Sequence, residues 1–483
     1  MMNYFQTIAS LPAMDHVAAQ RLLDEAVERF KHKIIVLDDD PTGTQTVHDV
    51  AVLTGWNADA IQKELKMPAR LFYILTNSRG LTREQTIALH TEITKNIHKA
   101  AKALNIQVLI VCRGDSTLRG HYPHETQAIY RELERLGEKP IDGEILCPYF
   151  KEGGRLTLFD THYLVDGERL VPVNETEFAK DRTFSYKHAN LPAWVQEKTE
   201  GAFTKNQVAS VRLEELRAMD MAVLSGKLKA LTGFQKLVVN ATEDADVKVF
   251  AAALLGALTE GKRFLIQSAA GLVKVLDNKA DRPLLSADEL SLGQAQSGGL
   301  VVVGSHVKKT SDQLAALKSL PELVEIELNQ HLALDSERFQ EEVTRVSQLT
   351  EAAVKVGRTA LVYTRRKRLD LPGGHPEDEL RLSRTISNGL TDIVRKLATR
   401  PRYLIAKGGI TSSDIGVFGL GVRRAVVWGQ VLPGVPVWKT GEESRFPGLP
   451  YVIFPGNVGK PDDLKNLVQA LEGLRTQSAQ QSN

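Results

Sequence analysis

Three consecutive carboxylates at positions 38–40 follow an apolar run of strand length and lead into a Pro-Thr-Gly loop. Adjacent like charges resist ionising together, so a cluster of this kind at a strand end is usually balanced by a ligand, a cation or a sugar hydroxyl. The alternative is a solvated acidic turn closed by Pro41 and Gly43. The arrangement indicates a binding or catalytic site, because folding alone does not require it.

Polar loops also follow the apolar runs at 71–75 and 108–112. Ligands of open parallel sheets bind beyond the carboxyl ends of the strands, where loops and helix N-termini converge. The three loops combine planar arginine donors, which suit a carboxylate, with acids, an amide and hydroxyls that can bind hydroxyl groups. A small polyhydroxylated acid would fit this mixture, unless the arginines only pair with neighbouring acids and order the loops. The candidate residues, besides Asp39 and Asp40, are Thr42, Gly43, Asn77, Arg79, Arg113, Asp115, Ser116 and Arg119.

Short apolar runs alternate with longer stretches of helical period around these loops, which is typical of an α/β fold with parallel strands. Thr82 and Gln85 have the spacing of a capping box at the start of a helix over 82–104. The pair Asp166-Gly167 favours a two-residue turn and thus predicts a β-hairpin insertion over 161–173. Strands are expected at about 34–38, 71–75, 108–112, 144–149, 236–240 and 264–268, and another helix at about 123–136.

The chain has 483 residues, which is more than one hydrophobic core usually serves. Between about 276 and 299 it becomes polar and rich in Gly, Ser and Asp, which indicates a domain boundary. A second alternating pattern follows, with strands near 300–304, 324–328, 359–364, 403–406, 425–428 and 451–454 and helices near 311–320, 336–356, 387–399 and 462–474. We therefore expect two α/β domains, over 1–280 and 295–475, each a largely parallel sheet flanked by helices.

Glycine-containing loops join strands to helices in the second domain, at 304–311, 406–414 and 454–459. Glycine lets the main chain approach a ligand closely, and the helix N-terminus that follows favours phosphate. These loops carry neither a Walker nor a Rossmann pattern, and each one alone also fits an ordinary tight connection. Together with the acid-and-arginine loops they suggest phosphoryl transfer from a nucleotide to a hydroxylated acid. The candidate nucleotide-binding residues are Ser305, Gly408, Gly409, Ile410, Thr411, Gly456, Asn457 and Gly459.

The composition argues against several other classes of function. The formal net charge of +2 comes from well-mixed acids and bases, so no basic stripe for nucleic acid is expected. No segment approaches eighteen uninterrupted apolar residues, and two isolated cysteines in predicted strands fit a reducing compartment. His121, His124 and His306 match no metal-ligand spacing. We expect a soluble, cytoplasmic protein that binds neither nucleic acid nor membrane and has no dedicated metal site.

The chain resembles the four-carbon acid sugar kinase family over about residues 33–475. The Asp-Asp-x-Thr-Gly motif of that family's substrate domain is matched at 39–43. The family's Gly-Ser, Gly-Gly-x-Thr and Gly-Asn-x-Gly loops are matched in the same order at 304–305, 408–411 and 456–459. Each motif is short, but the ordered combination is specific.

This resemblance implies an ATP-dependent kinase that phosphorylates a hydroxyl of a four-carbon sugar acid, such as threonate, erythronate or an oxo-tetronate. It implies a sugar acid on the first domain and ATP on the second, with Mg²⁺ arriving on the nucleotide. Asp39 or Asp40 would serve as the catalytic base, and a homodimer is compatible with the pattern. Pro41 and the residues after Gly43 depart from the best-known members, which leaves the choice of acid open rather than the reaction class.

Two other interpretations remain at the level of sequence. A ligase acting on a small hydroxy acid, or a phosphatase with metal in the acidic cluster, would consume ATP or release phosphate without forming a phosphorylated acid. A non-catalytic sensor on a kinase scaffold would bind an acid or a nucleotide without turnover.

Overall fold

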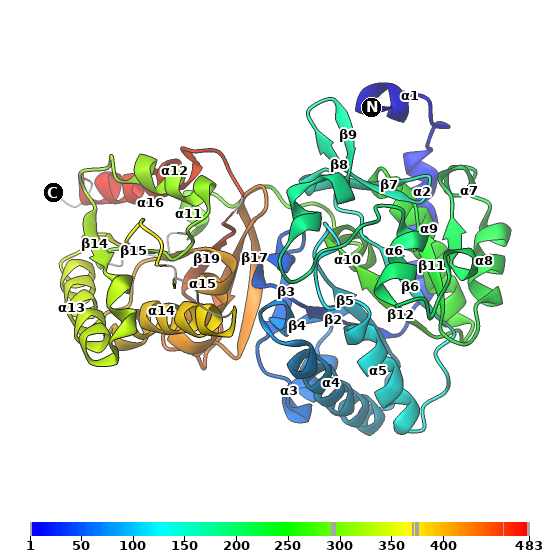
Figure 1. Cartoon of the computed structure of the whole chain (residues 1–483), viewed down its shortest axis with the longest axis horizontal. Coiled ribbons are helices and arrows are strands. Elements are labelled where there is room, and N and C mark those ends of the chain that lie inside the picture. Colours follow the sequence, from blue (N-terminus) through cyan, green and yellow to red (C-terminus); the bar gives the residue numbers. More distant parts are fainter. Residues whose placement is uncertain (1, 291–295, 370, 372–375, 457, 481–483) are drawn as a thin grey trace. The chain divides into compact units, whose positions relative to one another are not determined.

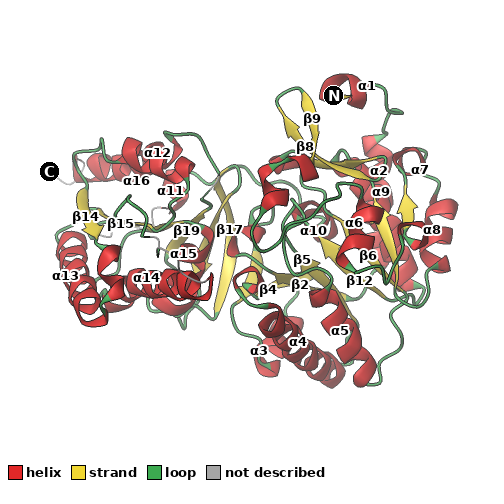
Figure 2. Ribbon diagram, in the orientation of Figure 1, coloured by secondary structure: helices red, strands yellow, loops and turns green. Residues whose placement is uncertain are grey.

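Apolar strands that are buried on both faces form the centre of the computed structural model, as parallel sheets covered by helices require. The structure describes residues 2–290, 296–369, 371, 376–456 and 458–480. It divides into two compact units, the first comprising 1–46 and 55–281 and the second 47–54 and 282–483. In both units the strands lie among helices (Figure 2), so the predicted α/β class with largely parallel sheets is confirmed.

The main sheet of the first unit contains seven parallel strands in the order β10-β11-β6-β12-β5-β2-β4. These strands are β2 (Lys33–Asp38), β4 (Leu71–Leu75), β5 (Val108–Arg113), β6 (Gly143–Cys147), β10 (Ala209–Val211), β11 (Gln235–Val239) and β12 (Phe264–Ser268). The six that were predicted all form, within one or two residues of the expected bounds. Their carboxyl ends meet at one edge of the sheet because every pair is parallel.

Helices cover this sheet (Figure 1). They are α2 (His16–Arg29), α3 (Ala58–Leu65), α4 (Arg83–Leu104), α5 (His124–Arg135), α6 (Leu191–Lys198), α7 (Leu213–Arg217), α8 (Met221–Ala230), α9 (Asp244–Thr259) and α10 (Ala270–Asp277), whereas α1 (Tyr4–Ala9) lies apart from this sheet at the N-terminus. The capping box predicted for α4 is present, with Thr82 and Gln85 each accepting a backbone N–H of the other. Both cysteines are buried and unpaired in strands, as expected.

The strand order reverses between β2 and β5. The chain passes from β2 to β4 on one side and then returns to place β5 on the other side of β2. Loops that leave such a reversal point in opposite directions open a crevice above the sheet, and ligands of α/β proteins bind there. The loops after β2 and β5 are those with the acidic and arginine residues.

A smaller antiparallel sheet in the first unit contains the predicted hairpin. Its strands are β1 (Met2–Asn3), β7 (Arg155–Leu158), β8 (Thr161–Asp166) and β9 (Arg169–Pro172), in the order β1-β9-β8-β7. The hairpin forms as predicted, but its two-residue turn is Gly167-Glu168 rather than Asp166-Gly167: Asp166 pairs with Arg169, and Gly167 has φ 61°. The two-residue strand β1 was not predicted, because a run so short has no periodicity.

The sheet of the second unit is mixed, in the order β3-β17-β18-β19-β16-β13-β15-β14. Its strands are β3 (Val50–Leu53), β13 (Leu300–Val303), β14 (Val324–Leu328), β15 (Ala360–Thr364), β16 (Leu404–Lys407), β17 (Arg424–Leu432), β18 (Val435–Thr440) and β19 (Pro450–Phe454). The five from β19 to β14 are parallel, so their carboxyl ends also share one edge. The helices are α11 (Ala287–Leu290), α12 (Lys308–Leu317), α13 (Ser336–Lys355), α14 (Pro376–Lys396), α15 (Gly409–Asp414) and α16 (Asp463–Gln480).

Segment 47–54 belongs to the second unit although it lies within the first 280 residues. Its strand β3 pairs antiparallel with β17, with Val52 opposite Ala425. The expected division into 1–280 and 295–475 therefore assigns segment 47–54 to the first domain, whereas it belongs to the second unit. Nothing in a four-residue apolar run indicates that its partner lies more than 370 positions further along the chain.

Within the described residues, no helix combines the length and the apolar character needed to cross a bilayer.

A fully buried ion pair lies on neighbouring strands of the first unit. Lys236 Nζ is 2.7 Å from Glu144 Oε2, both side chains are inaccessible to solvent, and Tyr122 donates to the same oxygen at 3.1 Å. Lys236→Met would leave a buried carboxylate without its cation. We expect it to lower the free energy of unfolding by about 3–5 kcal/mol. Urea denaturation measures this change.

The double variant Lys236→Met/Glu144→Gln removes both charges and serves as the control. It should recover most of the lost stability, because uncompensated charge rather than lost packing carries the cost. Equal stability of the single and double variants would contradict this account.

Candidate functional site

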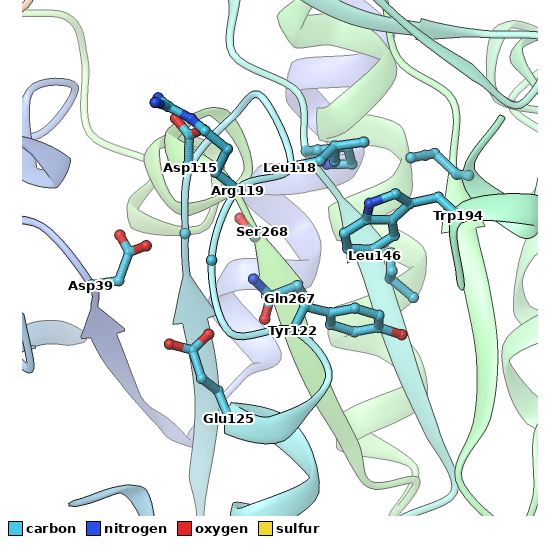
Figure 3. Close-up of a pocket in the computed structure, with 14 residues that line it drawn as sticks. Asp39, Asp115, Leu118, Arg119, Tyr122, Glu125, Leu146, Trp194, Gln267 and Ser268 are labelled. Carbon is cyan, nitrogen blue, oxygen red and sulfur yellow. The ribbon is translucent and has the colours of Figure 1, made fainter. Parts of the chain in front are cut away.

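A cavity opens at the carboxyl edge of the first unit's main sheet, beside the reversal point between β2 and β5 (Figure 3). Charged side chains lie on one side of it, and the aromatic side chains lie on the other. Residues from the loops after β2 and β5, from β6 and β12 and from α5 and α6 contribute, so no single segment of the chain forms it. Its lining residues are Asp39, Gly114, Asp115, Leu118, Arg119, Gly120, Tyr122, Glu125, Leu146, Pro148, Leu191, Trp194, Gln267 and Ser268.

Arg79 holds two of the three consecutive carboxylates. Its Nε and Nη2 donate to the two oxygens of Asp39 at 3.0 and 2.7 Å, and its Nη1 donates to Asp40 at 3.1 Å. Asp40 also accepts from the backbone N–H and the hydroxyl of Thr42, at 2.9 and 2.6 Å. This guanidinium therefore fixes the orientation of the Asp39 carboxylate at the cavity.

Arg113 lies beneath the same cluster and is 4% exposed, so the cavity does not reach it. Its Nη1 donates to Asp38 at 3.3 Å and is 3.8 Å from Asp39. The Nε of Arg113 and the second oxygen of Asp38 are buried without a hydrogen-bond partner in the described part of the chain. Arg113 therefore compensates the buried acids rather than facing a ligand.

Arg119, by contrast, lines the cavity and is about a quarter exposed. Its Nε donates to Asp115 at 2.8 Å, and the guanidinium also stacks over the ring of Phe178 at 4.9 Å. Nη1 lies 3.9 Å from Asp181, too far for a hydrogen bond. Arg119 thus keeps N–H donors for a ligand, which Arg113 does not.

The neighbours of the three consecutive carboxyls give them different pKa values. Burial raises the pKa of Asp38 to about 7 despite the charge of Arg113. Burial also raises the pKa of Asp39 to about 6, although two guanidinium groups oppose it. For Asp40, Arg79 and the hydrogen bonds from Thr42 outweigh burial, so its pKa is lowered. Near neutral pH, Asp39 is the member of the cluster that both lines the cavity and can exchange a proton.

Two polar atoms on the cavity wall have no partner. Trp194 is 3% exposed and stacks on Tyr122 with ring centroids 4.6 Å apart, while its indole N–H donates to nothing described. The side-chain oxygen of Gln267, on β12, is likewise buried without a donor. An unpaired buried polar atom costs about 1–3 kcal/mol, so these two atoms indicate where a polar ligand binds.

The predicted catalytic and substrate-binding residues lie at different places relative to the cavity. Asp39, Asp115 and Arg119 line the cavity, whereas Asp40, Thr42, Arg79 and Arg113 support them from behind. Gly43 packs directly against the Asp38 carboxylate. Asn77 and Ser116 do not line the cavity. Asn77 takes a left-handed backbone conformation with φ 52°, and the carbonyl of Ser116 accepts a hydrogen bond from His162.

In the second unit, the loops after β13, β16 and β19 converge. A methyl group on Gly408 would lie 3.1 Å from Ser305 Cβ, and one on Gly456 would lie 3.1 Å from Ser305 Oγ. Gly304 has no room for a side chain because Thr411 Oγ1 occupies that position. Only glycine allows these main chains to approach so closely, and the first turn of α12 follows directly.

Other predicted nucleotide-binding residues are distributed around these loops. Gly409 begins α15, and Ile410 is 67% exposed beside it. Gly459 lies further along its loop, against Gln313 and Asp463. Asn457 lies outside the described residues.

Lys407 was not predicted, although it ends an apolar strand just before the glycine pair. Its Nζ is fully buried and donates to the carbonyl of Pro455. Burial, reinforced by the charge of Lys309, lowers its pKa to about 7. A nearby phosphate would stabilise the protonated form of Lys407 and raise its pKa.

Other functional candidates escaped the sequence analysis for a physical reason. Glu125, Trp194 and Gln267 lie on elements whose sequence pattern is that of ordinary helices and strands. The polar Gln267 within the apolar run Phe264–Ser268 is the one available signal. Only the tertiary fold brings these side chains to one cavity.

Among the residues that the structure describes, no three or more His, Cys, Asp or Glu side chains are grouped to hold a metal ion. His121 and His306 instead hydrogen-bond to the carbonyls of Leu81 and Arg365, at 3.1 and 3.2 Å.

Comparisons with known proteins agree with this division of roles. A family model described as a sugar-binding N-terminal domain matches residues 34–276, and one described as a nucleotide-binding C-terminal domain matches residues 300–464. A Cupriavidus necator protein named 3-oxo-tetronate kinase is 26% identical over 370 residues, which are 74% of this chain and 77% of that protein.

Two crystal structures share the fold. A Haemophilus influenzae protein of family DUF1537 gives a TM-score of 0.59 at 19% identity and covers 90% of this chain and 99% of its own. A Salmonella typhimurium LT2 protein gives 0.62 at 16% identity, with 89% and 98% covered. At these identities the likeness concerns the fold alone.

The contact between Gly43 and Asp38 leads to a prediction. Gly43→Ala would push a methyl group into the Asp38 carboxylate and disturb the loop that carries Asp40. We expect a loss of about 1–3 kcal/mol in the free energy of unfolding. Gly55→Ala is the matched control, because a methyl group there meets nothing within 4 Å. Urea unfolding of both variants measures the difference, and equal effects would show that the carboxylate accommodates the methyl group.

Proposed function

Because this chain belongs to the four-carbon acid sugar kinase family, we propose that it uses ATP to phosphorylate a hydroxyl of a four-carbon sugar acid, such as threonate, erythronate or an oxo-tetronate. The observation that carries this proposal is the Asp39 carboxylate, fixed by Arg79 at the edge of a cavity that Arg119 also lines. A base and a guanidinium whose terminal N–H groups make no hydrogen bond among the described residues suit a substrate with both a hydroxyl and a carboxylate.

Arg119 would bind the carboxylate of the acid. It already contacts Asp115 through Nε, which leaves its terminal N–H groups for a second anion. Asp115 is held ionised, because the charges of Arg79 and Arg119 outweigh burial and keep its pKa well below the usual range. An ionised Asp115 accepts hydrogen bonds from substrate hydroxyls.

Asp39 would accept the proton of the attacking hydroxyl. Asp39 lines the cavity together with Gly114 and Gly120, on which a methyl group would lie 3.8 and 3.7 Å from Asp39 Oδ2. Asp40 suits the role less well, since it does not line the cavity and its pKa is lowered.

The nucleotide would bind the loops of Ser305, Gly408 and Gly456. Main-chain N–H groups, hydroxyls and the first turn of α12 all favour phosphate there. The described residues offer no cluster of carboxylates to hold a metal by themselves, so Mg²⁺ would be bound mainly through the phosphates of ATP. When bound, Mg²⁺ would neutralise charge on the transferred phosphoryl group.

A coupled assay of ADP release tests the proposal with ATP, Mg²⁺ and a panel of D- and L-threonate, D- and L-erythronate and their oxo forms. We expect turnover of at least one acid, with a phosphorylated acid as product. Asp39→Asn should lower kcat about 10²–10⁴-fold, because the base is lost. ADP release without phosphorylated acid would indicate a ligase or a hydrolase, and ligand binding without turnover would indicate a sensor.

The pH dependence separates the two aspartates. The folded protein raises the pKa of Asp39 to about 6, so the base becomes protonated as pH falls through that value. We expect kcat/KM to decrease below pH about 6 in the wild type and in Asp40→Asn, which retains the base. Loss of this acidic limb in Asp40→Asn, but not in Asp39→Asn, would reverse the assignment.

The unpaired atoms on the cavity wall should recognise oxygen atoms of the acid. Trp194→Phe keeps the ring but removes the N–H donor. We expect about a 10-fold lower kcat/KM for the hydroxylated acid and little change for the analogue that lacks the contacted oxygen. Trp56→Phe is the control, since its indole donates to Glu92 at an exposed site. Equal losses of kcat/KM for both acids would show that the indole N–H of Trp194 does not bind the contacted oxygen.

A further inference from the structure

Arg366 lies just after β15, at the same edge of the sheet as the glycine loops of the second unit. Its Nη2 donates to the carbonyl of Ser305 at 2.8 Å and to the hydroxyl of Ser311 at 2.7 Å. Ser305 belongs to the loop after β13, and Ser311 lies in the first turn of α12. The guanidinium is therefore hydrogen-bonded to the loop after β13 and to the first turn of α12, which suit a phosphate.

The rest of this guanidinium is buried without a partner. Nε and Nη1 are inaccessible to solvent and donate to nothing among the described residues. Burial lowers the pKa of Arg366, and no acidic side chain in the described chain offsets this effect. An arginine remains protonated in such a place, so a partly buried positive charge has no acidic partner among the described residues.

The neighbouring Arg365, by contrast, has an acidic partner. Arg365 donates through Nε to Glu327 at 2.9 Å and is about half exposed. The backbone after β15 is also fixed, because Gln330 donates to the carbonyls of Arg365 and Lys367 at 2.7 and 3.1 Å. The missing partner of Arg366 is thus not a consequence of a loosely held segment.

We propose that Arg366 binds the phosphate chain of the nucleotide through Nε and Nη1, as a positioning group that the loops of Ser305 and Gly456 complete. The N–H groups of Nε and Nη1 point in different directions in the guanidinium plane, so they can donate to two separate phosphate oxygens. The contacts through Nη2 to Ser305 and Ser311 hold the side chain in place before the anion arrives. This inference rests on the proposed function, since it takes the anion to be a nucleotide phosphate.

Calorimetric titration of the full-length protein, without sugar acid, tests the assignment. The probes are ATP, AMP and inorganic tripolyphosphate. We expect Arg366→Gln to weaken binding of ATP and tripolyphosphate about 10- to 100-fold, as loss of a charge-assisted pair of hydrogen bonds predicts, and to affect AMP less. Arg366→Lys keeps the charge but not the rigidly oriented N–H donors, so it should fall between Arg366→Gln and the wild type.

Arg365→Gln is the matched control, one residue away and similar in charge, and its affinities should stay within about twofold of the wild type. Thermal unfolding of each variant without ligand shows that the fold is retained. ATP affinity unchanged in both Arg366 variants would overturn the assignment while leaving the proposed kinase function intact. Failure of the wild type to bind ATP or tripolyphosphate would instead remove the proposed function itself.

Discussion

The carboxylate of Asp39 is held by Arg79 and flanked by Arg113, and the arrangement of the first unit depends on this buried charge cluster. Three acids in succession cannot be buried at a strand end unless cations from elsewhere approach them. Arg79 follows β4 and Arg113 ends β5, the two strands on either side of β2. The cluster therefore links three neighbouring strand ends and fixes the geometry of the cavity that they border.

The candidate sites of the two units differ in how their positive charges are balanced. In the first unit the arginines are compensated by acids, and a carboxylate of altered pKa faces the cavity. In the second unit, Lys407 is buried and Arg366 is partly buried at the glycine loops, and neither has an acidic hydrogen-bond partner in the described residues. A cluster in which arginines balance the acids is suited to binding hydroxyl groups and transferring a proton. Cations without an acidic partner are suited to binding an anion.

The chemistry of individual loops could be read from the sequence because each depends on neighbours in the chain. The capping box of α4 formed as predicted, and the hairpin turn lies one residue from its predicted position, since each is decided within four residues. The strands of the main sheets were recognisable because a strand buried on both faces is a continuous apolar run. The family resemblance rested on the same local motifs.

The amino-acid sequence by itself determined the α/β class, the strand ends that carry the acids, and the order of the glycine loops. Only the tertiary structure decided that Arg119 lines the cavity while Arg113 is buried behind it, and that Gln267 and Trp194 join them. It also decided that strand β3 leaves the first unit to pair with β17. Local propensity fixes an element's type, but its partners depend on packing between distant segments, which no single stretch of the chain encodes.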